Sequence, residues 1–325
     1  MRVLVTGGTG FIGIHLIAAL AARGWHARCL VRQTSDRRPL AAYAVEYVVG
    51  SLQDVAALRR AVQGVEMVFH LAGATKAPTP ADFERINYVG TQTLLQACVD
   101  VGGTLHKFVY ISSIAAAGPS PSGVPMQESD VARPVGPYGR SKLQAEAAVL
   151  AYQACLPVTV LRPSAIYGPY DRDFLPLFRT VKRGVLPSVG RQELFVDVCY
   201  VTDLVRGMLA AAESPATCGE VFFLSGACHP WRDIGREIAR QLGVRPREMH
   251  LPPWLVLAAA TMADGWAHVC GRPAVLSRTN MRERLHPFWV FDRTKAQRVF
   301  GYVPQVSLTQ GIAQTLRWYR DVGWV

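Results

Sequence analysis

The sequence predicts an α/β protein, a doubly wound parallel sheet with a smaller, interleaved C-terminal lobe. First, apolar runs of strand length alternate with helical patterns along the first half of the chain, as in a parallel sheet covered by helices on both faces. Second, glycines at positions 7, 10 and 13 follow the first run and lead directly into a helical pattern. Third, 325 residues, of which 50% are hydrophobic, are enough to bury a large core and to form two lobes.

The expected elements follow one another in a regular order, and right-handed crossovers between them give the doubly wound topology. Strands are expected at residues 3–5, 27–31, 45–49, 65–70, 107–111 and 158–161. Helices are expected at residues 14–23, 55–62, 81–101 and 138–154. A strand at 221–224, before a helix at 233–242, could return to the sheet edge. We therefore expect a first domain at 1–170 with a return at 201–243, and a second lobe at 171–200 and 244–325.

The loop after the first strand reads Gly7-Gly8-Thr9-Gly10-Phe11-Ile12-Gly13. A strand, a glycine-rich turn and a helix in this order are the context that a dinucleotide-binding loop requires. Gly7 permits the tight turn, Gly10 lets the backbone approach a pyrophosphate, and Gly13 lets the helix pack closely on the strand. The phosphates then lie at the positive end of the helix, beside Phe11 and Ile12.

Tyr138 and Lys142 lie four residues apart, so on a helix their side chains share one face. Ser113 lies upstream, directly after a strand-like run. A phenol has a reference pKa of about 10, which a neighbouring ammonium and a positive nicotinamide ring lower. Tyr138 can then move a proton on or off a substrate oxygen, while Lys142 holds the nicotinamide ribose and Ser113 donates to that oxygen.

These motifs resemble the extended short-chain dehydrogenase/reductase family, the NAD-dependent epimerase/dehydratase superfamily, whose fold is the Rossmann sheet. Further matches cover most of the chain. They are His70-Leu71-Ala72-Gly73, Asn87-Tyr88-Val89-Gly90-Thr91, Leu161-Arg162-Pro163-Ser164-Ala165-Ile166-Tyr167-Gly168-Pro169, Tyr200-Val201-Thr202-Asp203 and Trp318-Tyr319-Arg320.

The resemblance implies an NAD(P)-dependent dehydrogenase or reductase with Ser113, Tyr138 and Lys142 as its catalytic residues. Ser113 is chosen over the adjacent Ser112 because the family's catalytic hydroxyl falls five residues before the glycine matched by Gly118. The resemblance also implies cofactor contacts along the strand ends, at Ser51, Leu52, Leu71, Ala72, Gly73, Pro163, Ala165 and Ile166. The family usually has an acidic residue where this chain has Ser51. Asn87 is a candidate for a structural or water-relay role, or for a helix-packing amide.

The second strand ends in Arg32 rather than in a carboxylate. In NAD-binding versions of this loop an acidic residue there accepts from the ribose 2′-hydroxyl. A guanidinium can instead pair with a 2′-phosphate and stack on adenine. Asp36 comes a few residues later, in an expected loop. The sequence therefore favours NADP(H), with NAD(H) as the alternative.

Substrate class divides the family. Its nucleotide-sugar branch usually carries an arginine seven residues before the aspartate matched by Asp203, and this chain has Val196 there. An apolar residue cannot pair a buried diphosphate, although Arg191 lies nearby. The branch of 3β-hydroxysteroid dehydrogenases and dihydroflavonol reductases fits better, because residues 74–80 are not acidic and residues 115–117 are alanines.

Phe174, Leu175, Leu177 and Phe178 begin the expected substrate lobe, either lining an apolar pocket or forming ordinary core. We therefore expect an oxidoreductase acting on a secondary alcohol or ketone of a bulky apolar substrate such as a sterol or related lipid. The alternatives are a nucleotide-sugar epimerase with tightly bound NAD, and a non-catalytic NADP(H)-binding subunit or sensor.

Composition narrows the setting. We expect no signal segment, because the first residues already have the pattern of the first strand. No apolar stretch reaches the roughly 20 residues of a bilayer span. Seven cysteines without a C-x-x-C pair, and eight histidines without metal-ligand spacing, favour a reducing cytoplasm and no metal. The net charge of +11 comes from arginines spread along the chain, which suits a polyanionic dinucleotide better than nucleic acid.

Residues 251–262 form an apolar run with Trp254, and Trp266 follows. The preferred interpretation is a packed helix of the second lobe or a lid over the substrate. The alternative is an interfacial helix over 251–268 that holds the protein peripherally at the inner face of a membrane. The family resemblance further implies a homodimer, formed by pairing the 81–101 and Tyr138–Lys142 helices.

Overall fold

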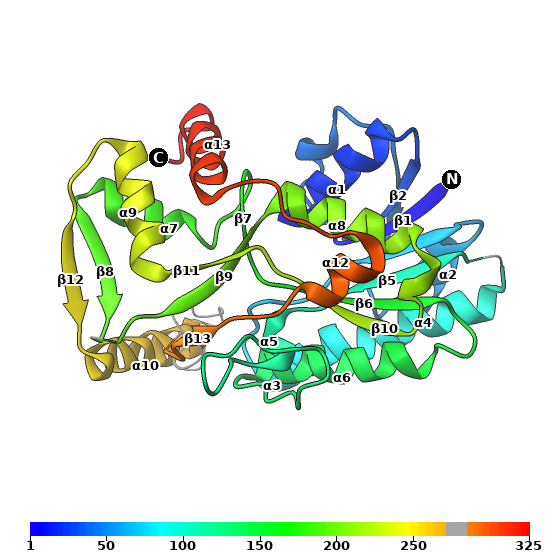
Figure 1. Cartoon of the computed structure of the whole chain (residues 1–325). Helices are drawn as coiled ribbons and strands as arrows, with labels where there is room; N and C mark the ends of the chain where they lie inside the picture. Colours follow the sequence, from blue (N-terminus) through cyan, green and yellow to red (C-terminus); the bar gives the residue numbers. More distant parts are fainter. Residues whose placement is uncertain (104, 191, 271–284) are drawn as a thin grey trace.

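The computed structural model describes residues 1–103, 105–190, 192–270 and 285–325, with the backbone alone for residues 264–270. The chain forms two lobes that lie side by side (Figure 1). The larger lobe contains the N-terminus, and the smaller lobe contains the C-terminus.

Seven parallel strands form the central sheet of the larger lobe. Their order, β10-β6-β5-β4-β1-β2-β3, starts from β1 in the interior and winds outward in both directions, which confirms the predicted doubly wound topology. The strands are β1 (Arg2–Thr6), β2 (His26–Val31), β3 (Val45–Val49), β4 (Met67–His70), β5 (Lys107–Ile111), β6 (Val158–Pro163) and β10 (Glu220–Leu224). Because all seven run the same way, their carboxyl ends share one edge of the sheet, where ligands of such folds bind.

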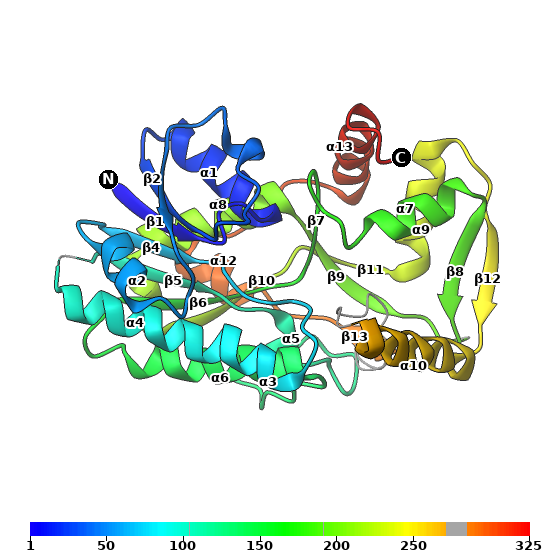
Figure 2. The ribbon, with the colours of Figure 1, turned by 180° about the vertical axis from the view of Figure 1, so that it is seen from behind.

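Helices cover both faces of this sheet (Figure 2). One core joins the sheet to α1, α8 and α12, and another joins it to α2, α4 and α6. The helices are α1 (Phe11–Ala22), η1 (Arg38–Leu40), α2 (Val55–Val62), α3 (Pro80–Phe83), η2 (Glu84–Val89), α4 (Gly90–Val101), α5 (Ile114–Ala117), α6 (Pro137–Ala151), α8 (Val201–Glu213), η3 (Pro215–Thr217) and α12 (Thr294–Phe300).

The helix expected at 81–101 is a run of three segments, α3, η2 and α4. The middle segment, η2, is a π-helical turn that contains Asn87. Such turns inside α-helices occur frequently at functional sites.

The smaller lobe has a mixed sheet and a separate two-stranded ribbon. The sheet has the order β11-β9-β13 with β7 also paired to β9, and the ribbon pairs β12 with β8. Its elements are β7 (Ala165–Tyr167), α7 (Leu175–Lys182), β8 (Val185–Val189), β9 (Phe195–Tyr200), β11 (Ala227–Pro230), α9 (Trp231–Leu242), β12 (Arg247–Leu251), α10 (Pro253–Cys270), β13 (Phe288–Trp289) and α13 (Leu308–Asp321).

Two segments pack in a different lobe from the one that the sequence analysis assigned to them. Ile234 and Ile238 of α9 pack in the core of the smaller lobe, although 201–243 was expected to return to the first domain. Ala296 and Tyr302 pack in a core of the larger lobe, although 244–325 was assigned to the second. Periodicity shows which side of an element is apolar, but it does not show which partner covers that side.

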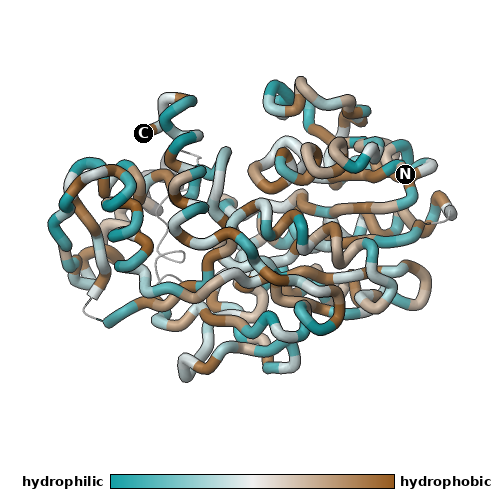
Figure 3. Tube along the Cα trace, turned by 45° about the horizontal axis from the view of Figure 1, so that its top comes forward, coloured by the Kyte–Doolittle hydropathy of each residue, from teal (hydrophilic) through white to brown (hydrophobic). Residues whose placement is uncertain are grey.

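Hydrophobic stretches run through both lobes, as the tube in Figure 3 shows. Each lobe accordingly has a core of its own, centred on the parallel sheet in one and on α7, α9 and α13 in the other. Within the described residues, every helix is too short or too polar to cross a membrane.

Candidate active site

The glycine loop between β1 and α1 is closed by contacts that only glycines allow. Gly7 has a φ of 74°, and a Cβ there would lie 2.8 Å from the backbone nitrogen of Ala72. A Cβ on Gly13 would lie 2.3 Å from the carbonyl oxygen of Gly7. Gly10 is the extended N-cap of α1 and has no side-chain cap, so the first N–H groups of the helix remain available to an anion. Phe11 and Ile12, the first two helical residues, are half-buried. This cradle fits a dinucleotide pyrophosphate.

The end of β2 leaves a guanidinium exposed. Arg32 is exposed and has no ion pair within the described part of the chain, while its backbone N–H donates to Ser35 Oγ at 3.0 Å. The carboxylate of Asp36 is paired to Arg38 at 2.7 Å, and these hydrogen bonds lower the pKa of Asp36 to about 2. Asp36 is therefore already engaged, and Arg32 is the unengaged group beside the adenosine end of the loop.

A buried histidine shapes the loop after β4. His70 is fully buried, with Nδ1 at 2.6 Å from Thr6 Oγ1 and Nε2 at 2.9 Å from Thr91 Oγ1. Burial lowers the pKa of His70 to about 3, so the imidazole is neutral. Thr6 Oγ1 also accepts from the backbone N–H of Ala72 at 3.1 Å. The backbone of 71–73 is thereby held against Gly7, where it is expected to contact the coenzyme.

Asn87 connects this loop to α6. Its Oδ1 accepts from Ala74 N at 2.7 Å, and its Nδ2 donates to Ala74 O at 3.0 Å and to Ser141 Oγ at 2.9 Å. The π-helical turn places this amide where it can clamp the loop. All of its amide groups are used within the protein, which supports a structural role over a water relay.

The two expected adenine neighbours differ in exposure. Ser51 is half-buried, and its hydroxyl accepts from Gln53 N at 3.3 Å. Leu52 is 7% exposed and packs below α4, where a Cβ on Gly90 would lie 2.8 Å from Leu52 Cβ. Leu52 thus belongs mainly to the core.

Ser112 and Ser113 have different surroundings. Ser112 is buried and donates to the carboxylate of Glu146. Ser113 is the half-buried N-cap of α5, and its Oγ accepts from Ala115 N at 3.1 Å, which leaves its hydroxyl proton free to donate. The structure thereby supports the choice of Ser113 made from the sequence.

Helix α6 brings Tyr138 to the same place. Gly139 packs so closely on α5 that a Cβ would lie 2.2 Å from the carbonyl oxygen of Ala115. This contact places Tyr138 beside the turn that begins at Ser113. The ring of Tyr138 also lies 6.1 Å from that of Phe83 in α3. The phenol and the hydroxyl therefore share the carboxyl edge of the sheet.

Lys142 is buried one turn further along α6. Its Nζ donates to the carbonyl of Ile111 at 2.7 Å and lies 4.2 Å from the ring centre of Tyr110. Burial lowers the pKa of Lys142 to about 7, although the carboxylate of Glu146 acts in the opposite direction. A Cβ on Gly73 would lie 4.0 Å from Nζ. Burial therefore makes the ammonium easier to deprotonate than that of an exposed lysine, and the amine lies beside the loop expected to hold the coenzyme.

The chain crosses from one lobe to the other directly after β6. Pro163 pairs with Leu224 in the main sheet, whereas Ala165 and Ile166 pair with β9 of the smaller lobe. Between them, Ser164 is 6% exposed, and its hydroxyl has no hydrogen-bond partner in the described part of the chain. A buried hydroxyl without a partner requires an explanation, and a bound ligand supplies one. From the sequence, Ser164 is only part of a family motif and has no predicted role, because the sequence does not show that its hydroxyl is buried without a partner.

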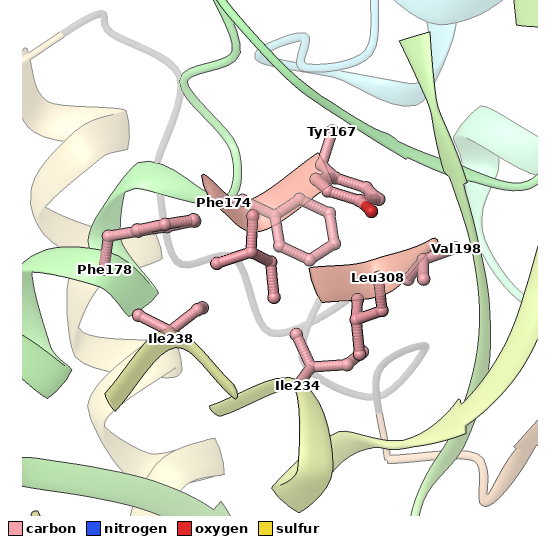
Figure 4. A pocket seen from close by; sticks show the side chains of 8 residues that line it. Tyr167, Phe174, Phe178, Val198, Ile234, Ile238 and Leu308 are labelled. Atoms are coloured by element: carbon pink, nitrogen blue, oxygen red, sulfur yellow. The ribbon is translucent and has the colours of Figure 1, made fainter. Parts of the chain in front are cut away.

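The expected substrate-lobe residues form core rather than a pocket. Figure 4 shows Phe174 and Phe178 converging with Tyr167, Ile234 and Ile238. These side chains leave no room for a water molecule between them. Leu175 and Leu177 are 8% and 7% exposed and belong to the same core. Of the two interpretations of this segment, the structure supports ordinary core.

Val196 is also engaged in packing. Its backbone is paired with His229 of β11 and with Trp289 of β13, and its side chain packs against two apolar clusters. Arg191, the nearby alternative for a phosphate contact, lies outside the described residues. Among the residues that the structure describes, no group of histidine, cysteine, aspartate and glutamate side chains has the arrangement of a metal site.

Known proteins resemble this chain over nearly its whole length. The model of the NAD-dependent epimerase/dehydratase family matches residues 3–224. A ceramide reductase of Caulobacter vibrioides is 33% identical over 324 residues, which are 99% of this chain and 96% of the relative. Sterol demethylase protein B of Methylococcus capsulatus is 30% identical over 342 residues, which are 100% of both chains.

A solved structure has a similar fold. The crystal structure of DesIV, a dTDP-glucose 4,6-dehydratase of Streptomyces venezuelae with NAD and TYD bound, has a TM-score of 0.81 and 28% sequence identity. The similarity covers 100% of this chain and 98% of that structure.

Proposed function

This chain belongs to the NAD-dependent epimerase/dehydratase family, in its 3β-hydroxysteroid dehydrogenase-like branch of extended short-chain enzymes, and we propose that it interconverts a secondary alcohol and a ketone on a bulky apolar substrate. Membership makes it an NAD(P)-dependent oxidoreductase. What supports the proposal is the packing of α6 on the turn that begins at Ser113, with Gly139 against Ala115 and Lys142 bound to the carbonyl of Ile111.

Three side chains divide the proton chemistry. The bound nicotinamide, when present, supplies or accepts the hydride. Tyr138 donates a proton to the ketone oxygen, or removes one from the alcohol. Lys142, in its ammonium form, would lower the pKa of that phenol and would hold the ribose of the coenzyme. Ser113, oriented by the N-terminal turn of α5, donates to the same substrate oxygen and stabilises the charge that develops there.

We propose NADP(H) as the preferred coenzyme. Arg32 is exposed at the end of β2, while Asp36 is bound to Arg38. A guanidinium there is suited to a 2′-phosphate, and no free carboxylate remains for a 2′-hydroxyl. The glycine cradle fits either coenzyme, and NAD is bound in the DesIV structure.

An apolar substrate is supported by the small residues of α5 and by the packing of Val196. Ala115 and Ala116 are buried and small, and Val196 is packed where a sugar-nucleotide enzyme of this family would present an arginine. Two relatives, the ceramide reductase and sterol demethylase protein B, are named for lipids. We therefore propose a sterol or a related lipid as the substrate class.

The two alternative functions make different predictions. A nucleotide-sugar epimerase would retain NAD tightly and show no net change in coenzyme. The likeness to DesIV keeps this possibility in view. A non-catalytic NADP(H)-binding subunit would bind coenzyme and be indifferent to loss of Tyr138, and the intact set of three catalytic side chains opposes it.

We further propose that α10 contacts the surface of a membrane from the cytoplasmic side. Trp254 and Met262 are 69% and 71% exposed, and Leu255 is 43% exposed. Of residues 253–263, only Ala260 is buried, so this part of α10 is not a packed helix of the second lobe, the first form of the preferred interpretation, while the second form, a lid, stays a prediction. An exposed apolar helix on a basic protein suits an anionic lipid surface. Sedimentation with anionic vesicles should fall for Trp254→Ser and stay unchanged for Arg59→Ser, an exposed change on α2.

We propose a homodimer in which the outer faces of α4 and α6 form the interface. Val89 and Val99 are 43% and 37% exposed, and Ala147 and Ala151 are exposed on α6. Ala147→Arg should therefore convert a dimer to a monomer in light-scattering measurements, whereas a monomeric wild type would refute the proposal.

Turnover tests the main proposal. Purified protein should oxidise NADPH in the presence of a sterol ketone or a long-chain lipid ketone. Tyr138→Phe should lower kcat about 100-fold or more without weakening coenzyme binding. Tyr152→Phe is the matched control, because its hydroxyl lies at the far end of α6 and donates to Gln96 at 3.0 Å. Equal rates for Tyr138→Phe and wild type would overturn the assignment.

A further inference from the structure

Behind the Tyr138–Lys142 face lies a cluster of three buried polar side chains, Ser112, Glu146 and Arg162. They are 5%, 2% and 6% exposed. Ser112 donates its hydroxyl proton to Glu146. Arg162 donates from Nε to both carboxylate oxygens, at 3.0 and 3.2 Å, and from Nη2 at 2.7 Å. The carboxylate is therefore fully engaged, as a buried charge must be.

This cluster is joined directly to the reacting groups. Glu146 follows Lys142 by one helical turn, as Lys142 follows Tyr138, so the three lie on one face of α6. Lys142 donates to the carbonyl of Ile111, and Glu146 accepts from the next residue, Ser112. Helix α6 thus holds the end of β5 at two successive residues, and the residue after them is Ser113.

We propose that Glu146 is a positioning residue for the reaction: it holds Ser113 opposite Tyr138 through Ser112, and its charge, balanced by Arg162, keeps Lys142 in the ammonium form. This inference rests on the proposed oxidoreductase function, and it assigns a role to a side chain that does not touch substrate.

The other groups that the structure describes around Lys142 carry no negative charge that could stabilise its ammonium form. Tyr110 on β5 faces Nζ with its ring, and burial raises the pKa of its phenol well above 10, so it carries no charge. His70 on β4 is neutral. Tyr138 is the group to be activated. In the described part of the chain, Glu146 therefore provides the negative charge that opposes the desolvation of Lys142.

Arg162 limits the effect of that charge. An unpaired carboxylate would also raise the pKa of the Tyr138 phenol, because a nearby negative charge disfavours the phenolate. The guanidinium on β6, itself 5.4 Å from the ring centre of Phe223, pairs with the carboxylate and balances its charge. The arrangement favours the ammonium without a large penalty on the phenolate.

Two substitutions separate the two parts of the proposal. Glu146→Gln keeps an acceptor for Ser112 and removes the charge. It should move the acid limb of the kcat/KM profile for alcohol oxidation to higher pH by about one unit, because a neutral Lys142 no longer lowers the pKa of Tyr138. Ser112→Ala removes the tie and keeps the charge. It should lower kcat about tenfold with an unchanged pH profile and coenzyme Kd.

Controls keep the test decisive. Thr159→Val removes a buried hydroxyl on β6 that donates to Thr217 O at 2.9 Å, and it should leave both readouts unchanged. If Glu146→Gln leaves too little folded protein, Glu146→Gln combined with Arg162→Met removes both buried charges together and should shift the profile in the same direction.

A measurement without turnover separates this inference from the proposed function. The phenolate absorbance of Tyr138, taken as the difference between each protein and its Tyr138→Phe version, should titrate at higher pH in the Glu146→Gln protein. This readout remains valid if the substrate class is wrong. An unmoved phenolate titration together with an unmoved kcat in Ser112→Ala would overturn the positioning role.

Discussion

Replacing Lys142 by methionine should abolish turnover and, at acidic pH, make the protein more stable. Burial lowers the pKa of Lys142 from 10.5 to about 7. In the unfolded chain the amine keeps its ordinary pKa, so below pH 7 folding forces a fully charged ammonium into a site that disfavours it. Since one pKa unit corresponds to about 1.4 kcal/mol, the fold loses about 5 kcal/mol there.

The sign of the pH dependence follows from the protons bound in each state. Between about pH 7 and 10.5 the unfolded chain binds more protons at this amine than the native protein does, so stability rises with pH across that window. By this linkage the penalty is about 5 kcal/mol near pH 6 and about 2 kcal/mol near pH 9. The Ile111 carbonyl loses its donor in Lys142→Met, which costs about 1–2 kcal/mol at either pH.

The expected net result is a gain in unfolding free energy of about 3 kcal/mol near pH 6 that falls to about zero near pH 9. Urea denaturation of the coenzyme-free protein at both pH values measures it. Lys107→Met is the matched control, because Lys107 is 2% exposed and its Nζ donates to Ser214 O, Thr217 Oγ1 and Cys218 Sγ. That variant should be less stable than wild type. A constant difference between Lys142→Met and wild type across pH would refute the reasoning.

Three further predictions address the coenzyme cradle and the junction of the lobes. Gly7→Ala should abolish coenzyme binding in calorimetry, because its Cβ would lie 2.8 Å from the Ala72 nitrogen at a φ of 74°; retained binding would contradict the cradle. Arg32→Ser should lower the preference for NADPH over NADH at least tenfold in kcat/KM through loss of a charged contact worth about 1.5–3 kcal/mol, and an unchanged ratio would place the 2′-phosphate elsewhere. Lys76 and Asp173 form an ion pair of 2.6 Å between the loops of the two lobes. Reversing either charge should change substrate KM about threefold, and exchanging both should restore it, whereas additive losses would mean no coupling.

The central sheet could be predicted from the sequence, and the candidate residues Tyr138 and Lys142 could be found there, because both depend on local patterns. Strand, glycine turn and helix are contiguous at Gly7–Gly13, and Tyr138 and Lys142 are linked by a single helical turn. The choice between Ser112 and Ser113 needed the family resemblance. The structure supports it, because Glu146 engages Ser112 from a helix far along the chain.

The parts that the sequence did not predict depend on long-range packing. Phe174 and Phe178 give the same sequence pattern whether they line a cavity or fill a core. Only their packing with Ile234 and Ile238 distinguishes a cavity from a core. The exposure of Trp254 likewise follows from which elements leave α10 uncovered. Ser164 carries a signal only once its missing partner is known.

The two buried lysines show why stability and function separate in this fold. Lys107 donates three hydrogen bonds, to one backbone carbonyl and two side chains, and these compensate its burial. Lys142 makes a single hydrogen bond to the backbone, and burial depresses its pKa by several units. A hydrophobic side chain of similar length would fill the space of Lys142 at lower cost to the fold. The fold stabilises the charged form of Lys142 poorly, and this amine lies one turn from a phenol and near the glycine cradle. The proposed catalytic role would account for a residue with that cost. By the same reasoning, the stability gain of Lys142→Met and its loss of turnover both come from removing the buried amine. A variant at position 142 that gained stability and still turned over substrate would contradict this argument.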